Sequence, residues 1–166
     1  CIYWVSSYLY SLFTESPFTF LKFKDSFSRH DLNLVIEVTE REPLHVDEEL
    51  VQRLNILHEN GFVIALDDFG TGHANLNYLL KYPFDTLKID KEFVTGIEPD
   101  TRSTKIVEGI ISLAHNFGIE VLAEGVETQS QLDRLMQIGC DKIQGFFISP
   151  PVLAEEIPLL LTQYNP

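Results

Sequence analysis

The sequence predicts an α/β protein whose parallel strands form a (β/α) barrel of the TIM type. Strand-like and helix-like segments alternate along the chain from residue 34 onward, which is the arrangement that parallel βα units produce. The strand-like segments are nearly unbroken apolar runs, as expected of strands covered on both faces. Each clear strand also ends in or near a polar side chain. Polar groups gathered from many strand ends are typical of a barrel rather than of a doubly wound sheet.

The predicted elements follow one another in a regular order from residue 34. Short apolar runs predict strands over residues 34–38, 62–68, 86–90, 119–124 and 142–148. Apolar side chains spaced three or four apart predict helices over residues 47–60, 75–81, 101–117, 128–138 and 154–162. Gly61, Gly118 and Gly139 follow three of these helices, where a left-handed C-cap favours glycine. Thr128 is predicted to cap the helix that it precedes, and Pro83 to end the helix before it.

The beginning of the chain fits no such order. Residue 1 is Cys1 and the single methionine is Met136, so we expect a fragment, a processed product or a trimmed chain. Residues 1–5 are interpreted as a strand, whereas the remainder of residues 1–30 has no clear pattern. We therefore expect a barrel that is incomplete on its N-terminal side.

Composition favours one globular domain and excludes two kinds of partner. The 166 residues are 45% hydrophobic and carry a net charge of −13, which suits a domain with a real core. The negative charge argues against polymeric nucleic acids and anionic membranes, because both attract basic patches. Cys1 and Cys140 form no disulfide or zinc pattern, and no signal peptide or spanning segment is evident. We expect a cytoplasmic domain, and a parent protein anchored in the inner membrane is compatible with this.

Two adjacent carboxylates, Asp67 and Asp68, end the most apolar strand and precede a Gly-Thr-Gly turn. Successive side chains in a strand point to opposite faces, so the two share a site only if the chain bends there. Gly70 and Gly72 permit such a bend. Carboxylates about 4 Å apart repel by roughly 4 kcal/mol at an effective dielectric near 20, which a cation or a shared proton would relieve. A helix N-cap is the alternative interpretation.

Further polar residues occur at the ends of the other predicted strands. They are Glu37, Lys88 with Asp90, Glu124 and Gln144. Carboxylates without a Cys or His pattern select Mg²⁺ or Mn²⁺, and two such ions favour in-line attack on a phosphodiester. Structural alternatives exist for three of these residues: Lys88 paired with Asp90, Glu124 as a helix cap, and Gln144 as a buried structural residue instead of a contact to a base edge or ribose. The five histidines are interpreted as solvated or packing residues.

Five segments in order resemble the EAL-domain cyclic-di-GMP phosphodiesterases. They are Ile-Glu-Val-Thr-Glu (36–40), Leu-Asp-Asp-Phe-Gly-Thr-Gly (66–72), Leu-Lys-Ile-Asp (87–90), Ala-Glu-Gly-Val-Glu-Thr (123–128) and Ile-Gln-Gly-Phe-Phe-Ile-Ser-Pro (143–150). The clear motifs cover residues 32–151. The resemblance implies a TIM-type barrel that hydrolyses cyclic di-GMP to pGpG with two Mg²⁺ or Mn²⁺ ions. It also implies a possible homodimer and upstream sensor or GGDEF-type domains in the parent protein.

The resemblance also implies a role for each matching residue. Glu37, Asp67, Asp68 and Glu124 match the metal ligands, and the implied catalytic residues are Lys88, Glu124 and Asp68. Lys88 matches the lysine that positions the attacking water, and Glu124 also matches a suggested base. Glu40 matches the glutamate that holds the loop over residues 70–75. Supporting or substrate-side positions are matched by Glu40, Asp90, Glu127, Gln144, Gly70, Thr71 and Gly72.

Two departures from the family keep a second interpretation open. The Glu-Ala-Leu signature, whose glutamate binds metal in the family, is absent from the sequence. Trp4 aligns where the family has a metal-binding asparagine, and an indole offers a metal no lone pair. Residues 1–166 are thus interpreted as a partial EAL domain, either a phosphodiesterase or a degenerate module that binds cyclic di-GMP or a protein partner. A Schiff-base enzyme using Lys88 is a third, weaker interpretation, because the surrounding acids would keep the lysine protonated.

Overall fold

The computed structural model describes residues 2–6, 33–39, 48–70, 76–98 and 101–156. These residues form one six-stranded parallel sheet in which each strand pairs with the next one along the chain. The strands are β1 (Ile2–Ser6), β2 (Asn33–Thr39), β3 (Val63–Phe69), β4 (Thr86–Ile89), β5 (Glu120–Ala123) and β6 (Lys142–Ile143). A doubly wound sheet would reverse its strand order at a switch point. The unreversed order confirms the predicted TIM-type barrel architecture.

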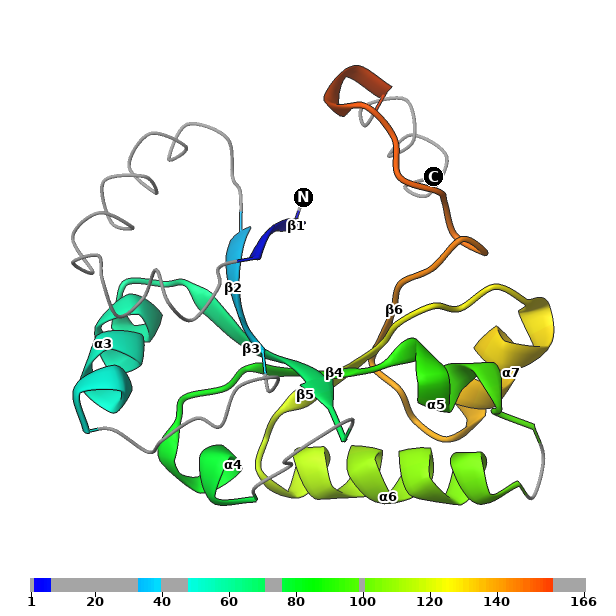
Figure 1. Cartoon of the computed structure of the whole chain (residues 1–166), viewed down its shortest axis with the longest axis horizontal. Coiled ribbons are helices and arrows are strands. Elements are labelled where there is room, and N and C mark those ends of the chain that lie inside the picture. The colour runs from blue at the N-terminus through cyan, green and yellow to red at the C-terminus, as the bar shows by residue number, and fades with distance from the viewer. Residues whose placement is uncertain (1, 7–32, 40–47, 71–75, 99–100, 157–166) are drawn as a thin grey trace.

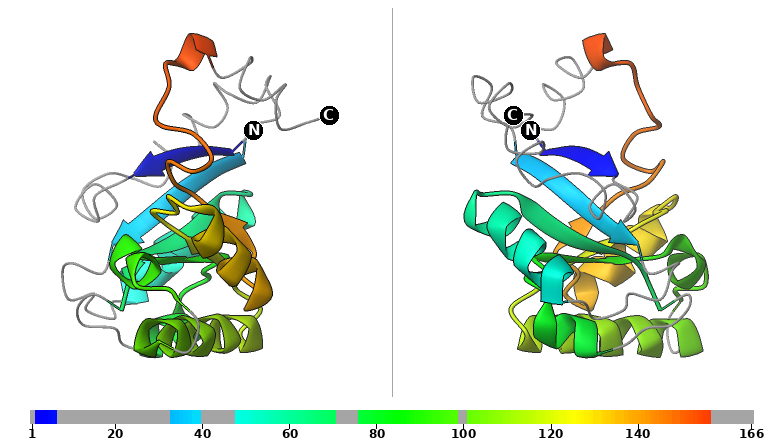
Figure 2. Two further views of the ribbon diagram at one scale, coloured as in Figure 1. Left: turned by 90° about the vertical axis from the view of Figure 1, so that its right-hand side faces the viewer. Right: turned by 60° about the vertical axis from the view of Figure 1, so that its left-hand side comes forward.

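The helices lie outside the curve of the sheet. They are α3 (Glu48–Glu59), α4 (Asn77–Lys81), α5 (Lys91–Thr95), α6 (Arg102–Asn116) and α7 (Gln129–Gln137), with a 3₁₀ turn, η1, at Ala154–Glu156. Figures 1 and 2 show the strands as an arc whose outer side is covered by α3, α6 and α7. Among the described helices, none is long and apolar enough to cross a membrane.

The main core lies between the outer face of the sheet and these helices. Its fully buried members include Ile64 and Leu66 from β3, Leu54 from α3, Val107 from α6 and Leu135 from α7. From β2 to β5 these outward residues alternate with residues that face the inside of the curve, because side chains alternate along a strand. The alternation therefore sends Glu37, Asp67 and Lys88 to one common side, away from the helices.

Most predicted elements are confirmed, and their caps agree with the sequence. Gly61, Gly118 and Gly139 all have positive φ values, of 77°, 72° and 85°. Thr128 accepts a hydrogen bond from the Gln131 amide in a complete capping box.

One predicted element is wrong, and one helix of the structure has no counterpart among the predicted elements. The strand over residues 142–148 ends at Ile143, because residues 145–148 form a turn in which the Ile148 amide donates to the Gly145 carbonyl. Helix α5 was not predicted at all, since it has only five residues and follows β4 after a single residue, Asp90. Of the helix predicted over 154–162, the structure describes only the η1 turn; the remainder lies outside the described residues.

Two His–Asp pairs tie helix ends to the amino-terminal side of the sheet. His58, in the last turn of α3, lies 3.0 Å from Asp85, which also accepts the Ile64 amide of β3. His115 and Asp141 repeat this arrangement at 2.8 Å, and Asp141 accepts the Val121 amide of β5. These histidines are half-exposed, as expected, and also make specific contacts. His30, His45 and His73 lie outside the described residues.

Asp141→Asn is expected to lower the free energy of unfolding by about 1 kcal/mol near neutral pH, because the contact with His115 loses its charge. Burial raises the pKa of Asp141, but hydrogen bonds from His115 and the Val121 amide outweigh it and hold that pKa below the ordinary 3.8. A carboxylate with a lowered folded-state pKa stabilises the protein above its unfolded pKa, and this contribution is lost as the pH falls through the folded value.

Urea titrations at a series of pH values measure this effect. The difference between the unmodified chain and the variant should shrink below about pH 4. A difference that stays constant to the acid limit of the folded state would contradict this role of Asp141.

Candidate metal centre

Five of the predicted site residues meet at the carboxyl ends of four neighbouring strands. Glu37 lies on β2, Asp67 and Asp68 lie on β3, Lys88 lies on β4, and Glu124 directly follows β5. The backbone amide of Glu124 donates to the Ile89 carbonyl, which extends the pairing of β4 with β5. The hydrogen-bonded pairing of the strands therefore sets the spacing between the backbone positions of these residues.

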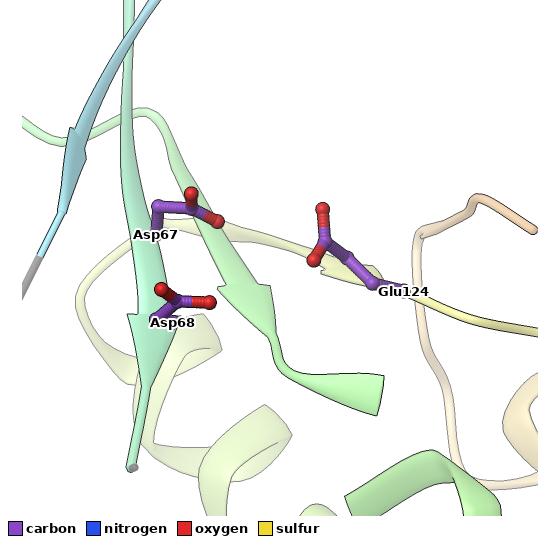
Figure 3. A group of neighbouring side chains, drawn as sticks. All are labelled: Asp67, Asp68 and Glu124. Carbon is purple, nitrogen blue, oxygen red and sulfur yellow. The ribbon is translucent and has the colours of Figure 1, made fainter. Parts of the chain in front are cut away.

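A local bend brings both carboxylates of the Asp67–Asp68 pair to one side. Asp68 has a φ of 57°, in the left-handed region, and the pairing of β3 with β4 shifts register between Leu66 and Phe69. Figure 3 shows the Asp67 and Asp68 carboxylates on the same side of β3, facing Glu124. The bend thus begins at Asp68 itself, two residues before the predicted glycine turn, and Gly70 continues it with a φ of 93°. Such a conformation costs about 1–3 kcal/mol in a residue other than glycine, and strain of this kind is concentrated at functional sites.

Lys88 lies at the centre of the carboxylates. Its ammonium nitrogen is 2.9 Å from Asp67 Oδ1 and 2.7 Å from Glu124 Oε1, and it also donates a short hydrogen bond to Glu37 Oε1. Lys88 is only 4% exposed and Glu37 only 7% exposed. The structural alternative pairs Lys88 with Asp90. In the structure the Asp90 side chain instead accepts a hydrogen bond from the Glu92 amide and caps α5.

The charges of this group are strongly coupled. Burial lowers the pKa of Lys88, but its contacts with Glu124, Glu37 and Asp67 outweigh burial and raise that pKa above its ordinary value. The three carboxylates that contact Lys88 favour its charged form, which argues against the Schiff-base interpretation, because that chemistry needs a neutral amine. Burial raises the pKa of Glu124, and the charges of Asp67 and Glu37 add to this, whereas Lys88 opposes it.

The donor set fits a hard divalent cation. Asp67, Asp68 and Glu124 each offer one carboxylate oxygen within 4.8 Å of the others. Asp67 Oδ1 is buried and receives no well-directed hydrogen bond from the described residues, although it lies close enough to Lys88 for an ion pair. Oxygen-only ligands favour Mg²⁺ or Mn²⁺ over softer metals. Because the site holds four carboxylates and one ammonium, added positive charge would relieve their mutual repulsion. Glu37 stands apart from the three-oxygen group and contacts Lys88.

The remaining predicted site residues lie around this centre or outside the described residues. Gln144 is exposed, and not buried as its structural alternative required; its backbone pairs with the Ala123 carbonyl and the Val126 amide. Glu127 is also exposed, and its amide donates to the Gln131 side chain. Glu40, Thr71 and Gly72 lie outside the described residues.

One neighbour of the site was not found from the sequence. The ring of Phe93, on α5, lies so close to Gly70 that a Cβ added to this glycine would be 3.2 Å from it. Phe93 thus packs against the turn that follows the two aspartates. Helix α5 has only five residues, which is too short to show helical periodicity in the sequence. The sequence therefore does not indicate that Phe93 lies on a helix beside this turn.

Comparisons with known proteins agree on one family. The family model described as "EAL domain" matches residues 11–151. The "Probable cyclic di-GMP phosphodiesterase PdeG" of Escherichia coli K12 is 58% identical over 132 residues, which are 80% of this chain and 26% of PdeG. The chain thus spans about a quarter of that curated relative.

Solved structures give the same result. The EAL domain of Mycobacterium smegmatis DcpA matches with a TM-score of 0.88 and 34% identity, covering 96% of this chain and 72% of that one. The manganese/cy-diGMP complex of Klebsiella pneumoniae BlrP1 matches with a TM-score of 0.78 and 31% identity, covering 89% of this chain and 38% of that one.

Proposed function

Because this chain belongs to the EAL-domain family of cyclic di-GMP phosphodiesterases, we propose that it carries a metal-dependent centre that hydrolyses cyclic di-GMP to pGpG. The observation that carries this proposal is the convergence of Asp67, Asp68 and Glu124, within 4.8 Å of one another, beside the buried ammonium of Lys88. We also propose that residues 1–166 form part of one EAL domain, to which sensor or GGDEF-type domains are attached in the parent protein.

We propose that Asp67, Asp68 and Glu124 would hold two Mg²⁺ or Mn²⁺ ions, with Glu37 as a further candidate ligand. When bound, such ions would lower the pKa of a water molecule and stabilise the charge that develops on the attacking and leaving oxygens. The curvature of the Asp67–Asp68 segment supports this assignment, since it turns two adjacent carboxylates to one side.

The protein's own residues would handle the proton and the phosphate charge. Lys88, held as a cation by its three carboxylate neighbours, would orient the attacking water or a phosphate oxygen. Glu124 is the candidate proton acceptor where it does not hold a metal ion, since burial raises its pKa in the metal-free centre. Attack of water on phosphorus then opens one phosphodiester of the ring, and the released ribose oxygen takes up a proton.

A catalytically degenerate module is the alternative function, and Trp4 favours it. In the pairing of β1 with β2, Trp4 lies opposite Val35. Trp4 aligns with the asparagine that binds metal in the family, and an indole cannot replace that ligand. In this alternative the same carboxylates would be retained for binding cyclic di-GMP or a protein partner without turnover.

Hydrolysis of cyclic di-GMP by the intact protein, with Mn²⁺, Mg²⁺ or EDTA, tests the proposal. We expect pGpG to form with either metal and to fall to background in EDTA, as separated by chromatography. Nucleotide binding without turnover in either metal would favour the degenerate module. If the protein neither binds nor hydrolyses cyclic di-GMP, the hydrolase proposal is contradicted and the degenerate module could bind only a protein partner.

A further inference from the structure

The loop that carries Glu124 lies against the turn after β6, with backbone contacts on both sides. The Gln144 amide donates to the Ala123 carbonyl at 2.8 Å, and the Val126 amide donates to the Gln144 carbonyl at 3.1 Å. The Phe147 amide then donates to the Val126 carbonyl at 2.9 Å. The segment after β6 thus holds the backbone at Ala123 and again at Val126. Glu124 is the first of the two residues between these points.

Gly145 lies at the tightest point of this contact. A Cβ added to Gly145 would be 2.2 Å from the Val126 oxygen, 2.3 Å from its nitrogen and 2.7 Å from its carbonyl carbon. Separations below 3.0 Å essentially never occur for a real Cβ, and here every neighbour is backbone, which cannot rotate away as a side chain can. Gly145 is absent from the described glycines with positive φ. A glycine is therefore required at residue 145 by the lack of room beside the Val126 backbone, and not by the backbone conformation.

The opposite side of the loop is also closed. Gly125, with a φ of 69°, sits against Lys91 at the start of α5, and an added Cβ there would be 2.5 Å from Lys91 Cβ. The side chain of Val126 is fully buried in the core. The Glu124 loop therefore cannot move aside toward α5 to make room for a side chain at residue 145.

From this geometry we propose that Gly145 is a positioning residue that sets the place of the Glu124 carboxylate in the metal centre. A side chain at residue 145 displaces the Val126 peptide, and with it Glu124, whose carboxylate lies 2.7 Å from Lys88 Nζ. Displacements of about 1 Å in a catalytic group can cost about a hundredfold in rate. The inference rests on the proposed hydrolytic function, and it adds a residue that neither binds metal nor touches the reacting atoms.

Gly145→Ala, compared with Gly109→Ala, tests the inference in the intact protein. Gly109 is exposed on α6, and an added Cβ there has nothing within 4 Å. For G145A we expect kcat to fall by about tenfold to a hundredfold with KM changed by less than about threefold, and Mn²⁺ affinity to fall by about tenfold. G109A should keep all three values. A merely structural role would lower the melting temperature but leave kcat per folded molecule unchanged.

Amide hydrogen exchange, measured by NMR without metal or substrate, gives a readout that is independent of activity. In G145A the amides of Val126, Gln144 and Phe147 should exchange at least about tenfold faster, whereas amides of β2 and β3 should keep their protection. If the unmodified protein shows no hydrolysis, the proposed function fails and the exchange comparison alone decides the inference.

Two outcomes would overturn the inference. In the first, G145A keeps kcat, Mn²⁺ affinity and amide exchange within about twofold of the unmodified protein. In the second, G145A loses protection throughout the sheet, which would assign Gly145 to the stability of the whole fold and not to the placement of Glu124.

Discussion

Asp67→Asn is expected to reduce the hydrolysis of cyclic di-GMP by about a hundredfold to a thousandfold, a loss typical of removing one group that stabilises transition-state charge. The amide keeps the size of the side chain, but it removes the negative charge that a divalent ion requires and leaves Lys88 with one carboxylate fewer. Because Asp67 is only partly buried and repels its neighbours, the free energy of unfolding should change by less than about 1 kcal/mol.

Asp133→Asn is the matched control for this substitution. Asp133 is exposed on α7, where it accepts a hydrogen bond from Gln129, and it lies outside the carboxylate group. Initial rates at saturating Mn²⁺ and chemical denaturation of both variants measure the two effects. Full activity of D67N would rule out Asp67 as a metal ligand, whereas equal losses in D67N and D133N would indicate a general effect of charge.

Lys88→Met is expected to abolish hydrolysis and to lower the free energy of unfolding by about 3–5 kcal/mol in the absence of metal, as for a buried ion pair that loses one partner. Methionine fills much of the same volume, but Glu37, Asp67 and Glu124 would then face one another without a countercharge. Added Mn²⁺ should reduce the loss of stability, because it restores positive charge among the carboxylates and binds the folded state.

Lys142→Met supplies the control for the loss of a lysine. Lys142 forms an ion pair with Glu120 at 2.6 Å, but both side chains are substantially exposed, so we expect a change of at most about 1 kcal/mol. Urea titrations of both variants with EDTA and with Mn²⁺ separate the two cases. If K88M is as stable as the unmodified protein in EDTA, the charge balance described for the centre is wrong.

The barrel is predictable from the sequence because alternation and strand-end polarity are both local patterns. The apolar run over residues 62–66 leads directly into Asp67 and Asp68, and β5 is followed directly by Glu124. The sequence alone therefore assigns Asp68 and Glu124 to one edge of the sheet. Caps such as Thr128 are equally local and are confirmed.

The errors concern features that depend on contacts between segments. Residues 146–148 are apolar enough for a strand, but the turn around Gly145 is fixed by its contact with Val126, which is distant in the sequence. The left-handed Asp68 could not be anticipated, because only a few per cent of residues other than glycine adopt this conformation and the register shift against β4 is a tertiary feature. The pairing of Lys88 with carboxylates from β2, from β3 and from the residue after β5 likewise needs the assembled sheet.

Anomalous X-ray scattering from crystals of the intact protein grown with Mn²⁺ tests the central claim most directly. We expect at least one manganese peak within about 2.0–2.6 Å of carboxylate oxygens of Asp67, Asp68 and Glu124, the range of metal–oxygen bonds to hard cations. The peak should vanish in crystals of D67N and persist in those of D133N. Manganese bound elsewhere, with the three carboxylates still facing only Lys88, would contradict the assignment of this group as the metal centre.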